Sequence, residues 1–248
     1  EGRFGFAWSI RSPDPLRPLT GFGEPRREGG DDGPWLVEQS FPLPVRQPVL
    51  ACGKYVETGA LADRTPVRVW RYARANPQGG SIARFSAAAV TFFEGAFGAF
   101  PFPVLDIVET APATGGQAGP GILLMEGRDP AELARERNVT GALDFNMTFA
   151  HEIAHQWWGQ SVSWRSGRDV WLFEARAEYS GWLFVRTLKG NLGDLAERRW
   201  LARARSAASV SSIAASDGLT DDSVSRRQRA DLIYGKGALL LRRLARET

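Results

Sequence analysis

Cysteine, histidine and lysine are all scarce in this chain of 248 residues. The single cysteine, Cys52, excludes an internal disulfide framework and any metal cluster held by several thiolates. Arginine supplies most of the 31 basic residues, and the net charge is only +3. Because no run of basic residues is interleaved with aromatic ones, the sequence gives no support for binding to nucleic acid.

Long apolar runs are also missing. No stretch approaches the roughly 20 apolar residues of a membrane span, so no transmembrane segment is expected. The chain opens on Glu1 without a signal-peptide pattern and ends in the helical pattern GALLLRRLARET with no stop signal. We therefore expect a piece of a longer protein, cut at both ends, and the compartment and the oligomeric state are left open.

The residues that are abundant describe a folded protein with a large core. Hydrophobic residues make up 43% of the chain and charged residues 24%, and the aromatics include nine Trp and 14 Phe. Strand patterns come first, in 35–44, 47–57, 66–73, 103–110 and 122–126, with one helix predicted over 81–98.

From about residue 130 the pattern becomes helical. We expect one helix capped by Asp144 and running through Trp158, with Gly159 just past its end. Two more helices are predicted over 169–188 and 229–246, with a polar surface loop between them. Strands followed by helices favour an α+β fold with a β module in front.

Both histidines of the chain lie in the stretch HEIAHQWWG, residues 151–159. Positions four apart on a helix lie about 6 Å from one another on one face, so the imidazoles of His151 and His155 can converge on one metal ion. Glu152, next to the first histidine, can reach a water on such an ion without ligating it. This accounts for a glutamate at position 152. Zinc lowers the pKa of the water that it binds, and the carboxylate can take a proton from that water.

A hydrolytic zinc usually has three protein ligands and one open position. No third histidine remains, so the third ligand is expected to be a carboxylate, and Glu174 on the next predicted helix is the candidate. Glu178 lies one turn further along that helix, where it could accept a hydrogen bond from a ligand imidazole and orient the ring.

Together these motifs resemble the M1 family of zinc aminopeptidases. HEIAHQWWG, and after it WLFEARAEYSGW in 171–182, is similar to the family's HExxHxWxG and WLxEGxAxY signatures. LIYGKGALLL in 232–241 is similar to its Tyr-x-Lys-Gly helix, and TGGQAGPGILLME in 114–126 occupies the position of its glycine-rich exopeptidase loop and adjoining strand. The resemblance covers roughly residues 50–248.

The resemblance implies a thermolysin-like zinc metallopeptidase domain, in which a mixed β-sheet precedes a helical active-site region. This domain would span 59–248, truncated at its C-terminus, and 1–58 would be the C-terminal part of an N-terminal β-domain. One Zn²⁺ per chain would be held by His151, His155 and Glu174, with a peptide as substrate. Glu152 would be the general base, and the Tyr234 hydroxyl would stabilise the oxyanion that forms during peptide hydrolysis. The ILLME strand would be the sheet edge against which the peptide lies.

One part of the sequence departs from the family. Gln117, Ala118 and Gly119 stand where the family has Met, Glu and Asn, so the Glu that pairs with the substrate's free α-amine would be absent. An alternative alignment on the MEG of 125–127 would restore that carboxylate but leaves no strand after the loop. Phe173 and Ala175 also replace the Asn and Gly that usually flank the Glu ligand.

Three functions therefore remain open. The first is a zinc-dependent peptidase that removes N-terminal residues. The second is a metallopeptidase without N-terminal selectivity, which the loss of the loop Glu at Ala118 suggests. The third is a non-catalytic zinc-containing relative that binds peptides. Glu152 and Tyr234 together argue against the third, because a structural zinc needs neither a base nor an oxyanion donor.

Overall fold

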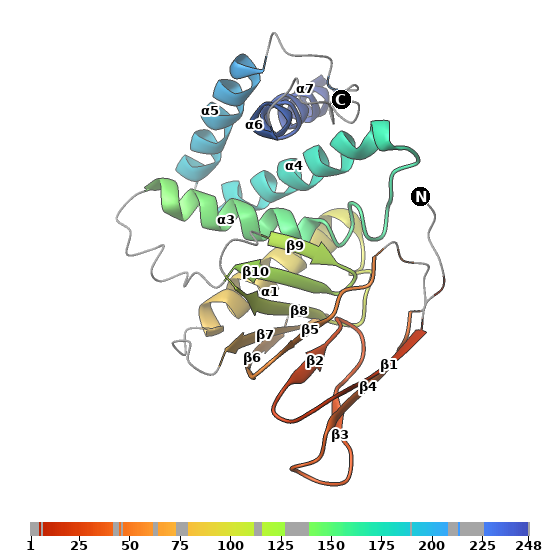
Figure 1. Cartoon of the computed structure of the whole chain (residues 1–248). Coiled ribbons are helices and arrows are strands. Elements are labelled where there is room, and N and C mark those ends of the chain that lie inside the picture. The colour runs from red at the N-terminus through yellow and green to blue at the C-terminus, as the bar shows by residue number, and fades with distance from the viewer. Residues whose placement is uncertain are drawn as a thin grey trace. The chain divides into compact units, whose positions relative to one another are not determined.

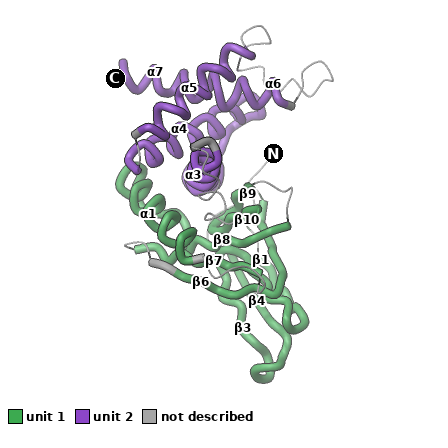
Figure 2. Tube along the Cα trace, turned by 90° about the vertical axis from the view of Figure 1, so that its left-hand side faces the viewer, with its two compact units in different colours: residues 1–135 green, residues 136–248 purple. Residues whose placement is uncertain are grey.

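The computed structural model describes residues 5, 7–41, 45, 47–61, 64–72, 79–111, 116–126, 139–188, 190–207, 213 and 226–247. The chain forms two compact units, Glu1–Arg135 and Glu136–Thr248, which Figure 2 colours separately. The first unit holds the strands and the second is helical.

Two small antiparallel sheets begin the first unit. One has the order β1-β4-β3, and the other pairs β2 with β5. Their strands are β1 (Ala7–Ser12), β2 (Arg17–Leu19), β3 (Arg26–Arg27), β4 (Trp35–Ser40) and β5 (Ala51–Gly53). In β4 the side chains of Val37 and Gln39 are buried while those of Glu38 and Ser40 are exposed, as the period of two in a strand requires.

A mixed five-stranded sheet follows, with the order β6-β7-β8-β10-β9 (Figure 1). Its strands are β6 (Tyr55–Leu61), β7 (Pro66–Tyr72), β8 (Leu105–Thr110), β9 (Gly116–Gly119) and β10 (Ile122–Glu126). The pairs β7–β8 and β8–β10 are parallel, whereas β6–β7 and β9–β10 are antiparallel. Helix α1 (Gly79–Phe97) connects β7 to β8 and packs against β6 and β7.

Among the described residues of the sheet, Asp106 has a fully buried carboxylate. Trp70 donates its indole N–H to Oδ1 of Asp106 at 2.8 Å, and Arg68 pairs with both carboxylate oxygens at 2.6 and 2.8 Å. A buried charge is tolerated when it is paired and hydrogen-bonded in this way. This cluster therefore ties β7 to β8 on the sheet.

The second unit is built from α4 (Val170–Leu188) and further helices. These are α3 (Val139–Ala154), α5 (Gly190–Ser206), α6 (Arg226–Ala230) and α7 (Ala238–Glu247), with a short 3₁₀ turn η1 (Gly167–Asp169). Between α6 and α7 the chain forms a π-helical segment, η3 (Asp231–Gly237). α4 packs along α3 and also contacts α5, η3 and α7. No helix among the described residues is long and apolar enough to span a membrane.

The strand and helix order agrees with the α+β expectation, and all five predicted strand regions contain strands. The helices predicted over 81–98, 169–188 and 229–246 are confirmed, the last with a π-helical part. Most of the predicted polar loop lies outside the described residues. The expected boundary after residue 58 falls inside β6, while the change from the small sheets to the five-stranded sheet comes between β5 and β6. The domain division after residue 58 stays a prediction.

Two expectations were wrong. The helix with the histidines begins at Val139 and ends at Ala154, so Asp144 lies inside it and pairs with Arg199 instead of capping it. The ILLME strand is not an edge, because β10 lies between β8 and β9. The tight turn at Pro120–Gly121, with Gly121 at φ 69°, lets the glycine-rich segment fold back as strand β9 and cover that side of β10.

Candidate metal centre and active site

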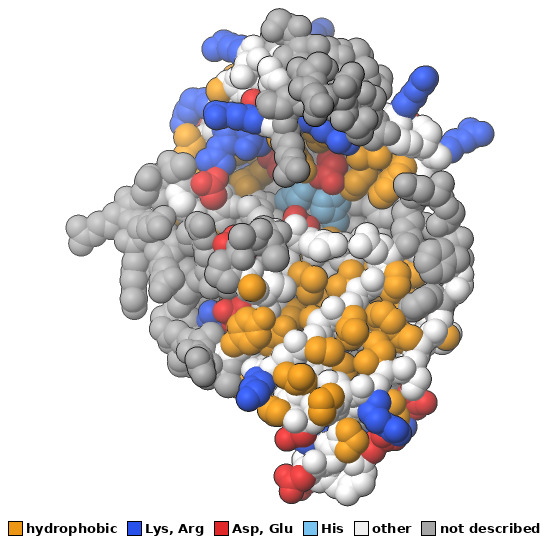
Figure 3. Space-filling model, viewed as in Figure 1, with side chains coloured by type: hydrophobic (Ala, Val, Ile, Leu, Met, Phe, Trp, Pro, Cys, Tyr) orange, Lys and Arg blue, Asp and Glu red, His pale blue; other side chains and the backbone are white. Residues whose placement is uncertain are grey.

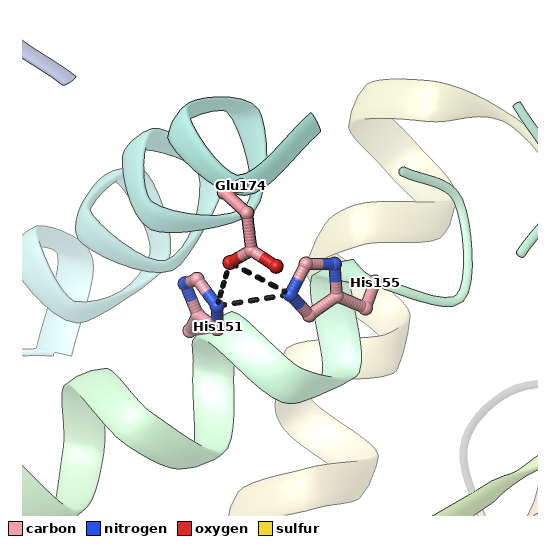
Figure 4. Close-up of side chains that lie close together, drawn as sticks. All are labelled: His151, His155 and Glu174. Carbon is pink, nitrogen blue, oxygen red and sulfur yellow. Dashed lines mark hydrogen bonds and ion pairs between the residues drawn. The ribbon is translucent and has the colours of Figure 1, made fainter. Parts of the chain in front are cut away.

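Two neighbouring helices of the second unit bring the three predicted ligands together. His151 comes from α3, His155 directly follows the last residue of α3, and Glu174 comes from α4; Figure 4 shows their side chains pointing toward one another. The two Nε2 atoms lie 2.9 Å apart, and Oε2 of Glu174 lies 3.4 Å from His151 Nε2 and 3.5 Å from His155 Nε2. The spacing predicted from the sequence therefore becomes one cluster of two nitrogens and one oxygen.

The end of α3 keeps the second histidine in register with the first. The amide of His155 donates to the carbonyl of His151 at 3.1 Å, which is the ordinary helical i to i+4 bond. Beyond it the chain turns, and Gly159 adopts φ 115° close to the ring of Phe173. Because this φ favours glycine, Gly159 ends the turn without a side chain that would meet Phe173.

The outer nitrogens of both rings face acceptors. Nδ1 of His155 lies 2.9 Å from the carbonyl oxygen of Trp158, to which it donates. Nδ1 of His151 lies 3.3 Å from Oε2 of Glu178, an ion-pair distance without the angle of a good hydrogen bond. With their protons on Nδ1, both neutral rings present an Nε2 lone pair to the cluster.

The cluster attracts positive charge. Burial by itself would lower the pKa of His151, but the carboxylates of Glu174, Glu178 and Glu152 outweigh it and hold that pKa well above its ordinary value. Burial would likewise raise the pKa of Glu174, but its contacts with His151 and His155 lower that pKa far below the usual range. Lone pairs from two imidazoles and an ionised carboxylate thus converge, and either a proton or a metal cation can balance them. The donor set fits zinc, which prefers nitrogen and carboxylate ligands.

Glu152 and Tyr234 line the same cavity as His151. This cavity has a volume of about 240 Å³, and Glu178, Arg199 and Arg203 also border it. Figure 3 shows a small area of imidazole at the surface with acidic side chains beside it. A carboxylate that borders the cavity without joining the cluster of ligand atoms is what a general base requires.

Tyr234 reaches the site from the π-helical segment η3. Its hydroxyl donates to Oε2 of Glu174 at 2.9 Å, and its ring lies 5.6 Å from that of His151. Burial first, and then the negative charge of Glu174, raise the pKa of Tyr234 far above its ordinary value. The phenol therefore stays protonated, as a hydrogen-bond donor must.

Two aromatic side chains, those of Phe173 and Trp164, lie next to His155, an arrangement that the sequence analysis did not predict. The ring of Phe173 lies 5.4 Å from that of His155, and Trp164 stacks on Phe173 at 4.3 Å. Phe173 occupies the position where the M1 pattern has Asn, so an aromatic ring stands beside His155 in place of an amide. Trp158 is partly buried and donates its indole N–H to Ser180 at 2.9 Å.

Sequence reasoning missed Trp200. It lies on α5, fully buried, and donates its indole N–H to Oε1 of Glu178 at 2.8 Å. No local motif marks this tryptophan, because its partner lies 22 positions away in the sequence. Only the apolar face of the helix between the Glu ligand and the Tyr motif could have suggested that Trp200 is buried.

The predicted substrate-binding residues belong to the first unit. Gln117, Ala118 and Gly119 lie on β9, with Ala118 opposite Leu123 of β10. Among the described residues β9 pairs only with β10, so it is an edge of the five-stranded sheet. Glu126, the carboxylate of the alternative alignment, ends β10, and the residues that follow it lie outside the described ones. The role of these residues in substrate binding stays a prediction.

Two histidines four apart on one helix and a carboxylate on the next define a metal site of the type found in zinc hydrolases. The chain belongs to peptidase family M1: the sequence model of the peptidase family M1 domain matches residues 86–247. The match includes every ligand candidate as well as Glu152 and Tyr234, and it begins within α1.

Several aminopeptidases are similar to this chain. Aminopeptidase 2 of Candida albicans is 28% identical over 127 residues, which are 50% of this chain and 14% of that protein. Aminopeptidase M1-B of Oryza sativa subsp. japonica is 29% identical over 138 residues, 54% of this chain and 15% of that protein. Human endoplasmic reticulum aminopeptidase 1 is 30% identical over 113 residues, 45% of this chain and 12% of that protein. The matched segments thus span only a small part of these relatives.

Proposed function

We propose that this chain carries the zinc-binding catalytic centre of a peptidase that removes residues from peptide N-termini. The observation that carries the proposal is the convergence of His151 Nε2, His155 Nε2 and Glu174 Oε2 beside a cavity that Glu152 and Tyr234 also border. Membership of family M1 and the aminopeptidase names of the relatives support it. The same proposal includes a thermolysin-like catalytic domain over residues 59–248, which follows the C-terminal part of a β-domain.

One zinc ion per chain would be held by His151, His155 and Glu174. When bound, zinc supplies a Lewis acid that polarises the scissile carbonyl and lowers the pKa of water toward about 7. The protein side of this site consists of two imidazoles oriented through their Nδ1 atoms and one ionised carboxylate.

The remaining chemistry belongs to two side chains at the cavity. Glu152 would take a proton from the attacking water and hand it to the nitrogen of the departing amine. Tyr234 would donate its hydroxyl to the oxygen that becomes negatively charged, an effect typically worth about 3–4 kcal/mol per donor. A structural metal site would need neither group, so their presence at the cavity supports catalysis over a purely structural zinc.

A second candidate is a metallopeptidase that does not require a free N-terminus. The observation in its favour is Ala118, which stands on β9 where the family pattern has the Glu that binds the α-amine. Without that carboxylate, burying an α-ammonium near the site would leave its charge unpaired at a cost of several kcal/mol.

The test is digestion of one peptide, supplied with a free and with an acetylated N-terminus, by the zinc-loaded chain, followed by mass spectrometry. Stepwise loss of residues from the free peptide alone supports the aminopeptidase. Cleavage of both peptides, or at internal bonds, supports the second candidate instead. The matched control is Glu152→Gln, which should bind zinc but release no product. If the zinc-loaded wild-type chain cuts neither peptide, peptidase activity of this chain is refuted.

A further inference from the structure

Glu178 has two different partners, one for each of its carboxylate oxygens. Oε1 accepts the indole N–H of Trp200 at 2.8 Å, and Oε2 lies 3.3 Å from Nδ1 of the ligand His151. Trp200 comes from α5, so the contact joins a third helix to the two that supply the ligands. Trp200, Glu178 and His151 therefore form a continuous chain of contacts that ends at the metal site.

The burial of Trp200 makes this contact rigid. Its side chain is fully buried, and its ring lies 5.7 Å from that of Trp182, another buried tryptophan. A buried indole N–H needs an acceptor, and Oε1 of Glu178 is the one it has. Holding one oxygen fixes the rotation of the carboxylate and so determines where its other oxygen points. Here that oxygen points at His151.

The backbone of α5 supports a second part of the site. A Cβ atom added at Gly235 would lie 3.1 Å from the carbonyl oxygen of Trp200 and 2.9 Å from the amide nitrogen of Ala204. The π-helical segment η3 therefore packs directly against the α5 backbone, one residue after Tyr234. The same residue of α5 thus contacts Glu178 through its side chain and the Tyr234 segment through its backbone.

We propose that Trp200 is a positioning residue for the metal centre: its indole N–H holds Glu178 so that Glu178 orients the His151 imidazole toward the ion. The proposal rests on the zinc site of the proposed function. Carboxylates that orient ligand histidines commonly contribute 10–100-fold to metal affinity. Trp200 would act through Glu178 without touching metal or substrate, and its loss should weaken zinc binding even in the absence of any peptide.

The experiment measures the zinc dissociation constant of the whole chain by competition with a chromophoric chelator. Trp200→Phe removes the N–H and keeps an aromatic ring, and we expect the dissociation constant to rise by about 10-fold. The matched control is Trp182→Phe, because Trp182 is equally buried but donates its N–H to the carbonyl of Gly193 at 3.0 Å and not to Glu178. This control should change zinc affinity by less than about two-fold.

A double-mutant cycle separates positioning from a general packing effect. Glu178→Gln should also weaken zinc binding, and adding Trp200→Phe to it should weaken binding no further, because the two residues act along one path. If Trp200→Phe does not fold, a tryptophan isostere with sulfur in place of the indole N–H keeps the packing and removes only the donor. The same rise in dissociation constant is expected for the isostere.

Three results would overturn the proposal. The first is an unchanged zinc affinity in Trp200→Phe or in the isostere. The second is additive losses in the cycle, and the third is an equal loss in Trp182→Phe. If the wild-type chain itself binds no zinc, the zinc site of the proposed function fails and the positioning role fails with it. If the wild type binds zinc and only the Trp200 effect is missing, the proposed function stands and this inference alone is wrong.

Discussion

The hydroxyl of Tyr234 donates to Oε2 of Glu174 at 2.9 Å, so one hydrogen bond joins the π-helical segment η3 to the carboxylate of the metal site. This oxygen is the one that faces both histidines. A donor on this atom competes with a cation for the same lone pairs. Metal binding is therefore expected to free the Tyr234 hydroxyl for a substrate oxygen.

The first prediction concerns that hydroxyl. Tyr234→Phe should lower kcat by about 10²–10³-fold, because it removes one donor to the developing oxyanion. Zinc affinity should not fall, since Tyr234 does not ligate the ion and its hydroxyl competes with the ion for Oε2 of Glu174. Steady-state kinetics and chelator competition on the same preparation measure both quantities. A variant that retains wild-type kcat would show that Tyr234 is not the oxyanion donor.

The second prediction separates ligand from base. Glu174→Gln should weaken zinc binding by more than the roughly 10–100-fold that outer-shell changes cost, because it removes the only ionised ligand. Glu152→Gln, which is also a carboxylate-to-amide change at the same site, should leave zinc affinity within about two-fold and abolish turnover. Bound zinc is measured after dialysis by atomic absorption. Equal zinc loss in the two variants would contradict the assignment of roles.

The third prediction concerns stability. Zinc at 100 times its dissociation constant should stabilise the folded second unit by about 2.7 kcal/mol, because the ion binds only when α3 and α4 are packed together. This corresponds to a rise in Tm of roughly 5–10 °C for a chain of this size. Thermal unfolding followed by circular dichroism, with zinc and with excess chelator, measures the shift. His155→Ala serves as the control and should show no rise; a rise of the same size in that variant would place the zinc elsewhere.

The fourth prediction concerns the packing of η3 on α5. A Cβ atom at Gly235 would meet Cβ of Arg203 at 2.7 Å and backbone atoms of α5 at 2.9 and 3.1 Å. Gly235→Ala should therefore destabilise the protein by about 1–3 kcal/mol and lower kcat by shifting Tyr234.

Gly95→Ala is the matched control for Gly235→Ala. Gly95 is exposed within α1, and a Cβ atom added there would meet nothing within 4 Å. This variant should be neutral or more stable by up to about 1 kcal/mol, because Ala favours a helix over Gly. Urea unfolding of the two variants gives the comparison, and equal stabilities would contradict the close packing at Gly235.

Several features could be predicted because they depend on residues close in sequence. The helical period places His151 and His155 on one face, and it also predicts α4 with Glu174 and Glu178 one turn apart. The M1 motifs then supplied Tyr234, which periodicity alone would not have distinguished from any other helical tyrosine. The structure brings these side chains together, and family membership is shown independently by the match over 86–247.

Other features depend on contacts between distant segments, and sequence patterns gave them incorrectly or not at all. The sequence predicts Asp144 as a helix cap, but α3 begins earlier and Asp144 instead pairs with Arg199 of α5. The M1 resemblance predicts ILLME as an edge strand, but β9 folds back onto it through the turn at Gly121. The partnership of Trp200 with Glu178 had no local signal.

The sequence by itself thus predicted the candidate ligands, the candidate base and the class of chemistry, because a metal site on a helix is specified by side-chain type and a spacing of four. Only the tertiary structure decided which of the two imidazoles Glu178 faces and which residue holds Glu178 in turn. Those contacts arise where α4 and α5 pack against each other, and the free energy of burying their apolar faces selects the partners rather than any short motif. The orientation of His151 by Glu178 and Trp200 is the result of that packing.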